Sequence, residues 1–395
     1  MKIALIAPST VLPVPAIHGG AIETLITGFI DKNEEKRLIQ ITVFSPYDKK
    51  AKLRAKKYVY TNFIWIRYTV VNKIVNLLTR SYSKISKRKI DHFGILQILN
   101  YLKRNNYSLV IVEGDEQLLF PVSRIVGTSR TVYHLHARLF ISPEVYNYCS
   151  IVIAVSNYIK KQVLLNTRKS EESVIVIKNC IDIQKFNYDR NCQFRSEIRL
   201  KYNIADSELV ICYTGRIVKE KGVMELLQSL LLLSESISFK AFIIGSPGSL
   251  FGLSSSVTSY YTELRSQADK LNNRIIFTGF VPNDRIPHFL AASDISVVPS
   301  MYEEPQGLTV LESFAAGLPV ITTDSGGIPE NVNEKTAIVI KRDQSLVSNM
   351  ATAIYDLMKS EAKRKEMRFS ALKYVQKFNF DTYYSDLVEL FKEIK

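Results

Sequence analysis

The stretch from Asp294 to Glu312 reads Asp-Ile-Ser-Val-Val-Pro-Ser-Met-Tyr-Glu-Glu-Pro-Gln-Gly-Leu-Thr-Val-Leu-Glu. An apolar run ends at Pro299, a polar loop follows, and Gly307 begins a helical pattern. This strand, loop and helix order is typical of a parallel sheet covered by helices. Glu304 in the loop and Glu312 on the helix offer carboxylates to sugar hydroxyls, and the N–H groups after Gly307 suit phosphate. An alternative is that these acids only interact favourably with the positive end of the helix dipole. This would account for an acidic residue at position 304, just before the helix, but not for Glu312, which lies farther along it.

The same alternation of Val/Ile-rich runs with helical patterns extends through all 395 residues. It predicts the α/β class, with one domain over residues 1–185 and a second over residues 203–375. The polar segment from Asn179 to Tyr202 is the expected linker. One long helix is expected from Leu346 to Val375. The C-terminal helix 378–395, with apolar residues at helical spacing, is assigned to the first domain.

Composition places the chain among soluble globular proteins, since 46% of its residues are hydrophobic and 23% are charged. Its four cysteines have no Cys-x-x-Cys spacing, which argues against a disulfide framework and a zinc site and suits a reducing cytoplasm. The apolar run from Ile3 to Ala7 meets Pro8 too soon for a signal peptide, and no stretch is long enough to span a membrane. A cytoplasmic protein is expected.

The net charge of +14 is concentrated in residues 51–100, where eleven Lys and Arg face a single acid, Asp91. One interpretation of this cluster is that its basic side chains simply form a solvated face of the protein and bind no partner. Another interpretation is that the cluster binds an anionic membrane surface, which attracts basic side chains by about 1 kcal/mol each. Nucleic acid is the third, without a supporting motif. We expect no nucleic-acid partner and an association with the membrane.

Two further turns suit phosphate. Gly215-Arg216 follows a predicted strand, with Lys221 shortly after. Open α/β sheets bind ligands beyond the carboxyl ends of their strands, where an Arg and a Lys can reach one diphosphate. Two surface cations beside a turn are the alternative. Gly19-Gly20 opens another helix, but without G-x-G-x-x-G spacing it is equally consistent with an ordinary turn.

His134-Leu-His136-Ala-Arg138 ends a predicted strand, and alternation puts both histidines on one face. His136 is a candidate ligand-binding residue. A satisfied structural histidine, or a partner of Arg138, is the alternative. Metal binding by the pair is not expected because no third ligand is in view.

Five motifs in order over the second half resemble the retaining family-four glycosyltransferases of GT-B architecture, which has two Rossmann-like domains facing across a cleft. The motifs are Gly215-Arg216 with Lys221, Phe280-Val281-Pro282, Asp294 to Ser300, Glu304 to Glu312, and Thr323 to Glu330. The first half is similar more loosely, through Gly19-Gly20, His136, Val155 to Asn157, and Asn179 to Asp182.

The resemblance implies a role for each matched residue. The catalytic group would be Arg216 and Lys221 on the donor diphosphate, Glu304 on the donor sugar, and His136 near the reacting carbon. The nucleotide-binding group would be Gly20, Gly215, Val281 beside the base, the amides of Gly307, Leu308 and Thr309, and Glu312 on the ribose. Three residues depart from the family pattern, namely Gln306 for Phe, Cys180 for Gly, and Glu23 one position late.

The expected activity is retaining transfer of a hexose from a nucleotide-diphosphate sugar, in first place a UDP-sugar, to a hydroxyl of a glycan or lipid-linked acceptor in cell-surface polysaccharide synthesis. The nucleotide sugar is a co-substrate, and no metal or other cofactor is expected, in agreement with the lack of an Asp-x-Asp tripeptide. The protein would be peripheral at the inner face of the membrane. The alternatives are a GT-B sugar-nucleotide epimerase and a non-catalytic sugar-nucleotide or membrane-binding module. A phosphorylase with a pyridoxal-phosphate lysine has no supporting motif.

Overall fold

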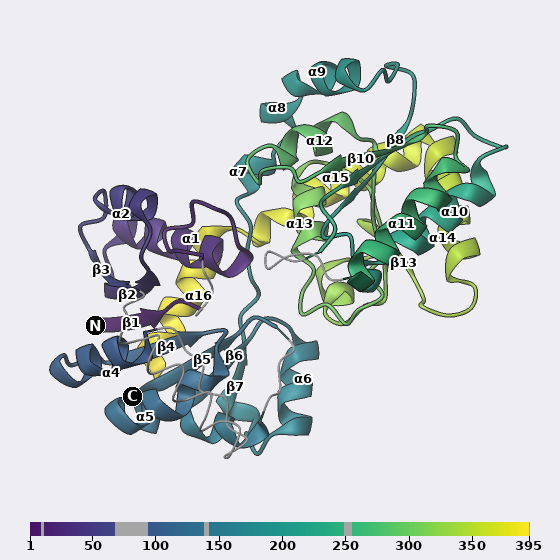
Figure 1. The fold of residues 1–395 in the computed structure, drawn as a ribbon. Coiled ribbons are helices and arrows are strands. Elements are labelled where there is room, and N and C mark those ends of the chain that lie inside the picture. Colours follow the sequence, from purple (N-terminus) through teal and green to yellow (C-terminus); the bar gives the residue numbers. More distant parts are fainter. Residues whose placement is uncertain (9–11, 68–93, 138–141, 249–254, 395) are drawn as a thin grey trace. The chain divides into compact units, whose positions relative to one another are not determined.

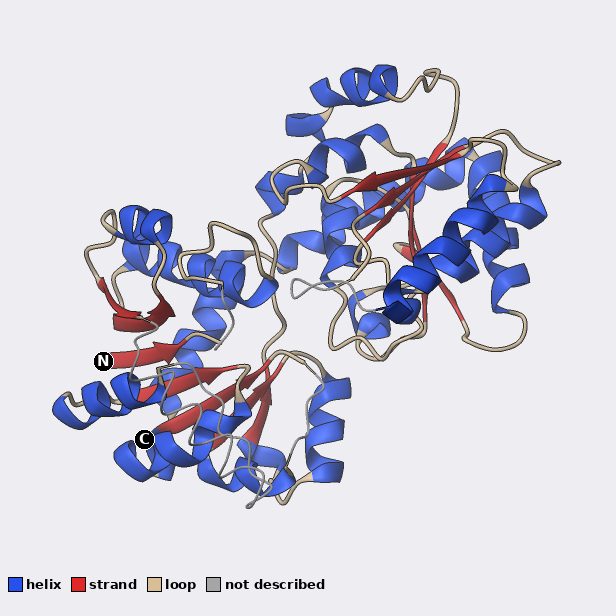
Figure 2. Cartoon of the chain, in the orientation of Figure 1, coloured by secondary structure: helices blue, strands red, loops and turns tan. Residues whose placement is uncertain are grey.

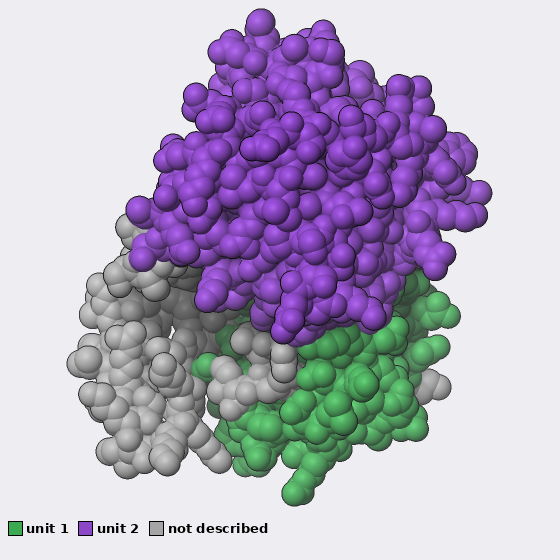
Figure 3. Space-filling model, turned by 90° about the vertical axis from the view of Figure 1, so that its right-hand side faces the viewer, with its two compact units in different colours: residues 1–180, 380–395 green, residues 181–379 purple. Residues whose placement is uncertain are grey.

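The computed structural model of this chain describes residues 1–8, 12–67, 94–137, 142–248 and 255–394 (Figure 1). The chain divides into two compact units, Met1–Cys180 with Phe380–Lys395, and Ile181–Asn379 (Figure 3). In each unit, the described residues form one parallel sheet with helices packed on its faces (Figure 2). The boundary after Cys180 lies within the predicted segment from Asn179 to Tyr202, although Ile181 to Lys185, which were assigned to the first domain, belong to the second unit.

The first unit is built on a sheet with the strand order β3-β2-β1-β4-β5-β6-β7. These strands are all parallel, but successive strands are added on one side of β1 up to β3 and on its other side from β4 onward. The point between β1 and β4 is therefore the switch point, where open α/β sheets bind their ligands. The strands are β1 Lys2–Ile6, β2 Gln40–Pro46, β3 Thr61–Ile66, β4 Leu109–Glu113, β5 Thr131–Leu135, β6 Ile151–Ala154 and β7 Val174–Val176. The main helices are α1 Ala21–Lys36, α2 Lys49–Ala55, α4 Ile95–Arg104, α5 Leu119–Val126, α6 Asn157–Asn166 and α16 Phe380–Glu393.

Alternating residues of β1 show how this sheet is buried on both faces. Ile3 and Leu5 belong to the core shared with α1 and α16, and Ala4 and Ile6 to the core shared with α4 and α5. Strand β3 was not predicted. Although Phe63 to Ile66 are apolar, it lies at the sheet edge and its middle residues are only partly buried, unlike those of the central strands.

The second unit has the strand order β10-β9-β8-β11-β12-β13, with its switch point between β8 and β11. The strands are β8 Val210–Thr214, β9 Lys240–Ile244, β10 Ile275–Gly279, β11 Ile295–Val298, β12 Val320–Thr323 and β13 Ala337–Ile340. The main helices are α10 Val223–Leu233, α11 Ser255–Asp269, α12 Ile286–Ala292, α13 Leu308–Ala315, α14 Leu346–Lys359 and α15 Glu361–Tyr374.

The predicted linker is wrong as a description of this segment, because it forms α7 Ile183–Phe186, α8 Tyr188–Asn191 and α9 Gln193–Lys201. The polar sequence of this segment was misleading as a sign of an exposed linker. Arg199 is only 1% exposed and pairs with Asp294 at 2.7 Å, so a charged residue here is part of the interior.

The single helix predicted from Leu346 to Val375 is also wrong. It is interrupted at Ser360, which adopts an extended backbone, and its hydroxyl accepts a hydrogen bond from the backbone N–H of Lys363. This is the geometry of an N-cap, so Ser360 ends α14 and begins α15.

Candidate active site

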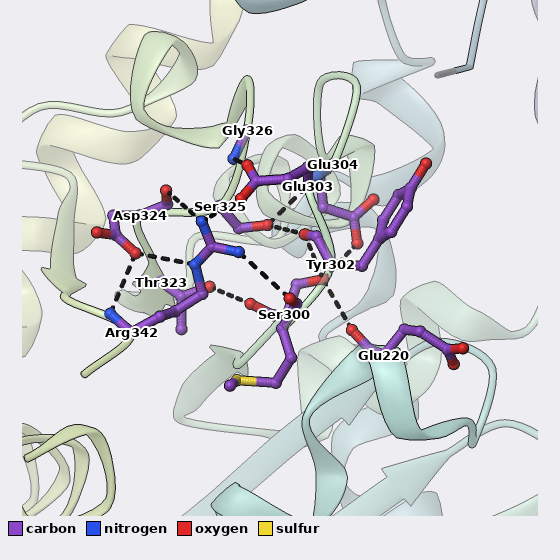
Figure 4. A network of polar contacts seen from close by, with 11 residues as sticks. Glu220, Ser300, Tyr302, Glu303, Glu304, Thr323, Asp324, Ser325, Gly326 and Arg342 are labelled. Carbon is purple, nitrogen blue, oxygen red and sulfur yellow. Dashed lines mark hydrogen bonds and ion pairs between the residues drawn. The ribbon is translucent and has the colours of Figure 1, made fainter. Parts of the chain in front are cut away.

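The loops after β8 and β11 meet at the switch point of the second unit. The carbonyl oxygen of Glu220 accepts hydrogen bonds from the backbone N–H groups of Met301, at 2.9 Å, and Tyr302, at 3.0 Å (Figure 4). Gly222 has φ 72°, and a Cβ there would overlap the carbonyl oxygen of Pro299. Glycine therefore permits the close approach that brings the two loops together.

This approach pairs two residues that the resemblance assigned to different parts of a donor. Lys221 Nζ lies 2.5 Å from Glu304 Oε1, and the same oxygen accepts a hydrogen bond of 2.6 Å from the hydroxyl of Ser300. Glu304 is only 9% exposed. The pair thus places one cation and one anion, largely shielded from water, at the carboxyl edge of the sheet.

The loop after β12 holds the backbone of the loop that carries Glu304. The Gly327 N–H donates to the Glu304 carbonyl at 2.8 Å, and the Ser325 hydroxyl bonds the Tyr302 carbonyl (Figure 4). Gly326 has φ 53°, and a Cβ there would overlap the Glu304 carbonyl oxygen. The matched motif from Thr323 to Glu330 therefore fixes the backbone that carries Glu304.

Sequence reasoning missed Arg342, which joins three loops. Its guanidinium donates to Glu303 Oε1 at 2.6 Å, to Asp324 Oδ1 at 3.0 Å and to the Met301 carbonyl at 3.2 Å (Figure 4). Glu303 Oε2 in turn accepts from the Gly326 N–H at 2.7 Å. An arginine shortly after the last strand was the available signal, and its hydrogen bonds to three separate residues suit a positioning role.

Helix α13 begins beside this loop. Gly307 is its N-cap with φ 79°, no side chain caps the helix, and a Cβ at Gly307 would lie 2.6 Å from Ile328 Cγ1. The first N–H groups of a helix, here those of Leu308 and Thr309, have no intrahelical acceptor and attract anions. The turn can therefore hold phosphate.

Glu312 lies farther along α13 and is partly buried. Burial raises the pKa of this carboxyl to about 7, although the charge of Lys185 acts in the opposite direction. Burial likewise lowers the pKa of Lys185. Lys185, on α7, is a second missed residue, because it falls in the segment expected to be a linker.

The other predicted residues of this unit have different surroundings. The side chain of Arg216 is exposed and has no hydrogen bond or ion pair within the described part of the chain. Gly215 is held close to the Tyr213 ring, and the partly buried Val281 packs against the core. Asp294, in contrast, precedes β11 and pairs with Arg195 and Arg199, so it is structural.

In the first unit, Glu113 ends β4 and binds both histidines of the His-Leu-His motif. Its Oε2 lies 2.7 Å from His136 Nε2 and 3.1 Å from His134 Nδ1. Burial alone would raise the pKa of Glu113, but the two histidines lower it to about 2. The carboxylate is therefore ionised, and both ring nitrogens donate to it.

This arrangement corrects the expectation that the histidine pair has no third ligand, because Glu113, His134 and His136 hold ligand atoms within 4.8 Å of one another. The short separations are those of hydrogen bonds. Burial and the neighbouring His134 lower the pKa of His136 to about 4, so its ring is neutral at neutral pH. Its Nδ1 is then an acceptor, buried and without a hydrogen-bond partner among the described residues. Arg138 lies outside those residues.

Gly20 is the N-cap of α1, with φ 97°. A Cβ there would overlap the carboxylate of Glu23, which is buried. The positive φ therefore favours glycine at this turn, whatever ligand it meets.

Comparison with known proteins matches residues 194–374 to the family described as "Glycosyl transferases group 1". A putative glycosyltransferase of Bacillus subtilis, YtcC, is 26% identical over 95% of this chain and 88% of its own length. The lipopolysaccharide 1,2-N-acetylglucosaminetransferase of Salmonella typhimurium is 25% identical over 67% of this chain and 70% of its own.

Among solved structures, a glycosyltransferase from Rickettsia africae superposes with a TM-score of 0.78 at 18% identity, covering 100% of this chain and 98% of its own. Anabaena HepE, in complex with UDP-glucose, gives a TM-score of 0.74 at 20% identity and covers 99% of both chains. These likenesses establish the two-domain fold. Residues 194–374 thus match the group 1 glycosyl transferases, relatives in sequence extend along most of the chain, and the fold of the two units is that of GT-B glycosyltransferases.

Proposed function

We propose that this glycosyltransferase moves a hexose from a UDP-sugar to a hydroxyl of a glycan or lipid-linked acceptor, with retention of anomeric configuration. The observation that carries the proposal is the Lys221 to Glu304 ion pair. It stands at the switch point of the sheet, in the loops that also present the start of α13 and Glu312. The loops at the carboxyl ends of these strands thus offer hydrogen-bond donors to a diphosphate and hydrogen-bond acceptors to sugar hydroxyls.

The pair suggests how the donor is received. In the free protein Lys221 neutralises Glu304; an incoming diphosphate competes for the ammonium group and frees the carboxylate to accept from the donor sugar. As the glycosidic C–O bond breaks, negative charge grows on the diphosphate. Arg216, Lys221 and the amides of Leu308 and Thr309 stabilise that charge, most strongly when water is excluded.

The resemblance favours front-face attack. The acceptor oxygen forms the new bond to the anomeric carbon, the bond to the diphosphate breaks, and the leaving phosphate oxygen takes the acceptor's proton. No side chain acts as nucleophile, and the fixed cations carry the role that a metal ion has in other transferases. In the second unit, Gly215 permits close approach of the diphosphate and Val281 is assigned to the base. In the first unit, the roles of His136 Nδ1 toward a sugar hydroxyl and of Gly20 toward the diphosphate are proposed from the resemblance alone.

The choice of UDP and of a cell-surface acceptor rests on similar proteins. HepE is a structural neighbour in complex with UDP-glucose. Relatives in sequence include the Salmonella lipopolysaccharide enzyme and a capsular polysaccharide biosynthesis glycosyltransferase of Staphylococcus aureus, CapM, 26% identical over 64% of each chain. A sugar-nucleotide epimerase and a non-catalytic binding module are the competing assignments.

The proposal is tested with a panel of UDP-, GDP-, ADP- and dTDP-sugars, first by thermal shift and then by turnover. A ligand at 100 times its Kd stabilises the folded protein by about 2.7 kcal/mol. We expect a UDP-hexose to give the largest shift and UDP release to require a hydroxyl acceptor, with NMR of the product showing the donor's anomeric configuration. UDP release without an acceptor product, or an inverted product, contradicts it.

A membrane contact is the second part of the proposal, and α2 supports it. Lys49, Lys52, Leu53 and Lys56 follow one another at helical spacing and are exposed, while Ala51 and Ala55 on the opposite face are buried. Leu53 is 66% exposed, and these three lysines have no acidic partner among the described residues. Among the described residues, no helix is long and apolar enough to cross a bilayer.

Two details narrow the predicted basic window. Lys57 pairs with Asp31 at 2.8 Å, and Tyr58 is buried, so neither is free for lipid. Lys73, Arg80, Lys84, Lys87, Arg88 and Lys89 lie outside the described residues.

We expect the change of Lys49, Lys52 and Lys56 to Glu to release the protein from phosphatidylserine vesicles. Loss of about 1 kcal/mol for each lysine amounts to about a hundredfold in affinity. Sedimentation with vesicles at low salt measures it, and higher ionic strength should weaken wild-type binding. The matched control changes exposed Lys335, Lys363 and Lys373 to Glu. Equal loss in the control would assign the binding to charge in general, and wild-type protein that does not bind anionic vesicles at low salt would contradict the membrane contact.

A further inference from the structure

A polar cavity lies at the amino ends of β11 and β12 in the second unit, at the opposite end of these strands from the candidate active site. It has a volume of about 250 Å³. Its floor is formed by Ser293 and Asp294, which precede β11, and by Gly317 to Pro319, which precede β12. The Glu304 loop follows the other end of β11. A strand of this length separates the two by roughly 10 Å or more, so the cavity is distinct from the candidate active site.

The side chains around this cavity are mainly cationic. Arg195, Arg364, Lys365 and Arg368 line it, against two carboxylates, Asp294 and Glu361. Asp294 is already shared by Arg195, at 2.8 Å, and Arg199, at 2.7 Å. Glu361 lies 2.6 Å from Lys365. Asp294 therefore does not pair with Arg364 or Arg368, and the hydrogen bond to Lys365 lowers the pKa of Glu361 more than the charge of Arg364 does.

Arg368 is held in place without using its hydrogen-bond donors. Its Cζ lies 4.0 Å from the centroid of the Tyr188 ring. Gly317 also lies beside the guanidinium. A Cβ at Gly317 would come within 3.3 Å of Arg368 Cζ, so the lack of a side chain there leaves room for the guanidinium. Within the described residues, its N–H groups have no hydrogen-bond acceptor. A planar fork fixed in this way loses little freedom on binding an anion.

Arg364 is fixed in a different way. Its Nη1 donates to the carbonyls of Leu357, at 2.6 Å, and Met358, at 2.9 Å, at the end of α14. Nε and Nη2 have no acceptor in the part of the chain that the structure describes. Arg364 and Arg368 are four residues apart on α15, a spacing at which like charges destabilise a helix. An anion between them would remove that cost.

We infer that this cavity binds a small phosphoryl anion, held by the guanidinium groups of Arg364 and Arg368. Guanidinium matches phosphate oxygens in pairs, and each charge-assisted hydrogen bond is strong. The anion is inorganic phosphate, diphosphate or the phosphate of a phosphorylated sugar. The site is independent of the proposed transfer reaction, because none of its residues belongs to the loops around Glu304.

The test is calorimetric titration with inorganic phosphate, diphosphate and a hexose 1-phosphate at about 0.15 M salt, where non-specific attraction is largely screened. The full chain carrying Lys221→Ala is the starting protein, so that the diphosphate contact at the candidate active site is weakened. Adding Arg364→Met and Arg368→Met should weaken binding by about tenfold to a hundredfold. The matched control adds Lys363→Met and Lys373→Met, which remove two exposed charges from the same helix.

Retained binding in the control and loss in the arginine variant support the site. Tighter binding of the hexose phosphate than of phosphate identifies an organic ligand, and equal binding identifies recognition of the phosphoryl group alone. Arg368→Lys keeps the charge but not the fork, so it should bind with intermediate affinity, and it serves as the test if the double variant unfolds. The inference is overturned if no probe binds, or if the control loses as much affinity as the arginine variant.

Discussion

Replacement of Lys221 by Ala is expected to lower kcat by about 10²- to 10³-fold, the usual loss when one preorganised charge contact to a transition state is removed. Lys221 is the cation closest to Glu304, at 2.5 Å, and its backbone is fixed by the hydrogen bonds that Glu220 accepts from the loop after β11. Its position therefore does not have to be organised during the reaction.

The fold should survive this change. Glu304 keeps its hydrogen bond from the Ser300 hydroxyl, and the Lys221 side chain is 24% exposed, so we expect a loss of about 1 to 3 kcal/mol in the free energy of unfolding. Steady-state kinetics and thermal unfolding of the same samples separate the two effects. Lys219→Ala is the matched control, since Lys219 is exposed in the same turn. Near-normal kcat in the purified Lys221 variant would remove this residue from the reaction.

The sequence predicts the central strands well, because parallel strands buried on both faces are continuous apolar runs. Ile3 to Ile6 and Leu109 to Val112 are examples. It fails where burial is partial or where a charge is buried. Strand β3 is a half-buried edge, and Arg199 belongs to the interior through Asp294, which no local pattern reveals.

The candidate site shows the same division. Motifs locate Glu304, Gly307 and Lys221, because their spacing along strand, loop and helix is local. The partners that position them come from distant segments. Arg342 reaches Glu303 from beyond β13, and Lys185 faces Glu312 from α7. Glu113 binds His134 and His136 because β4 and β5 are adjacent, with Glu113 in register with His134. Such pairs are set by the topology of the sheet.

Replacement of Glu312 by Gln should stabilise the protein while weakening its binding of nucleotide. The pKa of Glu312 is raised from 4.5 to about 7 by burial, so the unfolded chain releases this proton at lower pH than the folded one. The free energy of unfolding of the wild-type protein therefore falls as pH rises through this interval, and the loss is complete above about pH 7, at no more than about 3 kcal/mol. Gln carries no such proton. The Tm of the variant should exceed that of wild type at pH 8 and approach it near pH 5, with the gain reduced because Lys185 loses its neighbouring charge.

Binding should move in the opposite direction, because a carboxylate accepts two ribose hydroxyls through charge-assisted bonds and an amide oxygen does not. We expect Glu312→Gln to weaken both the free nucleoside diphosphate and the nucleotide sugar by about tenfold or more. Glu304→Gln is the matched control. It should weaken only the sugar-bearing donor, because Glu304 is assigned to the sugar. Calorimetry with both ligands measures the difference. An equal loss for both ligands in both variants would refute the division of roles, and a Tm for Glu312→Gln below that of wild type at pH 8 would show that the buried carboxylate stabilises the fold in its charged form.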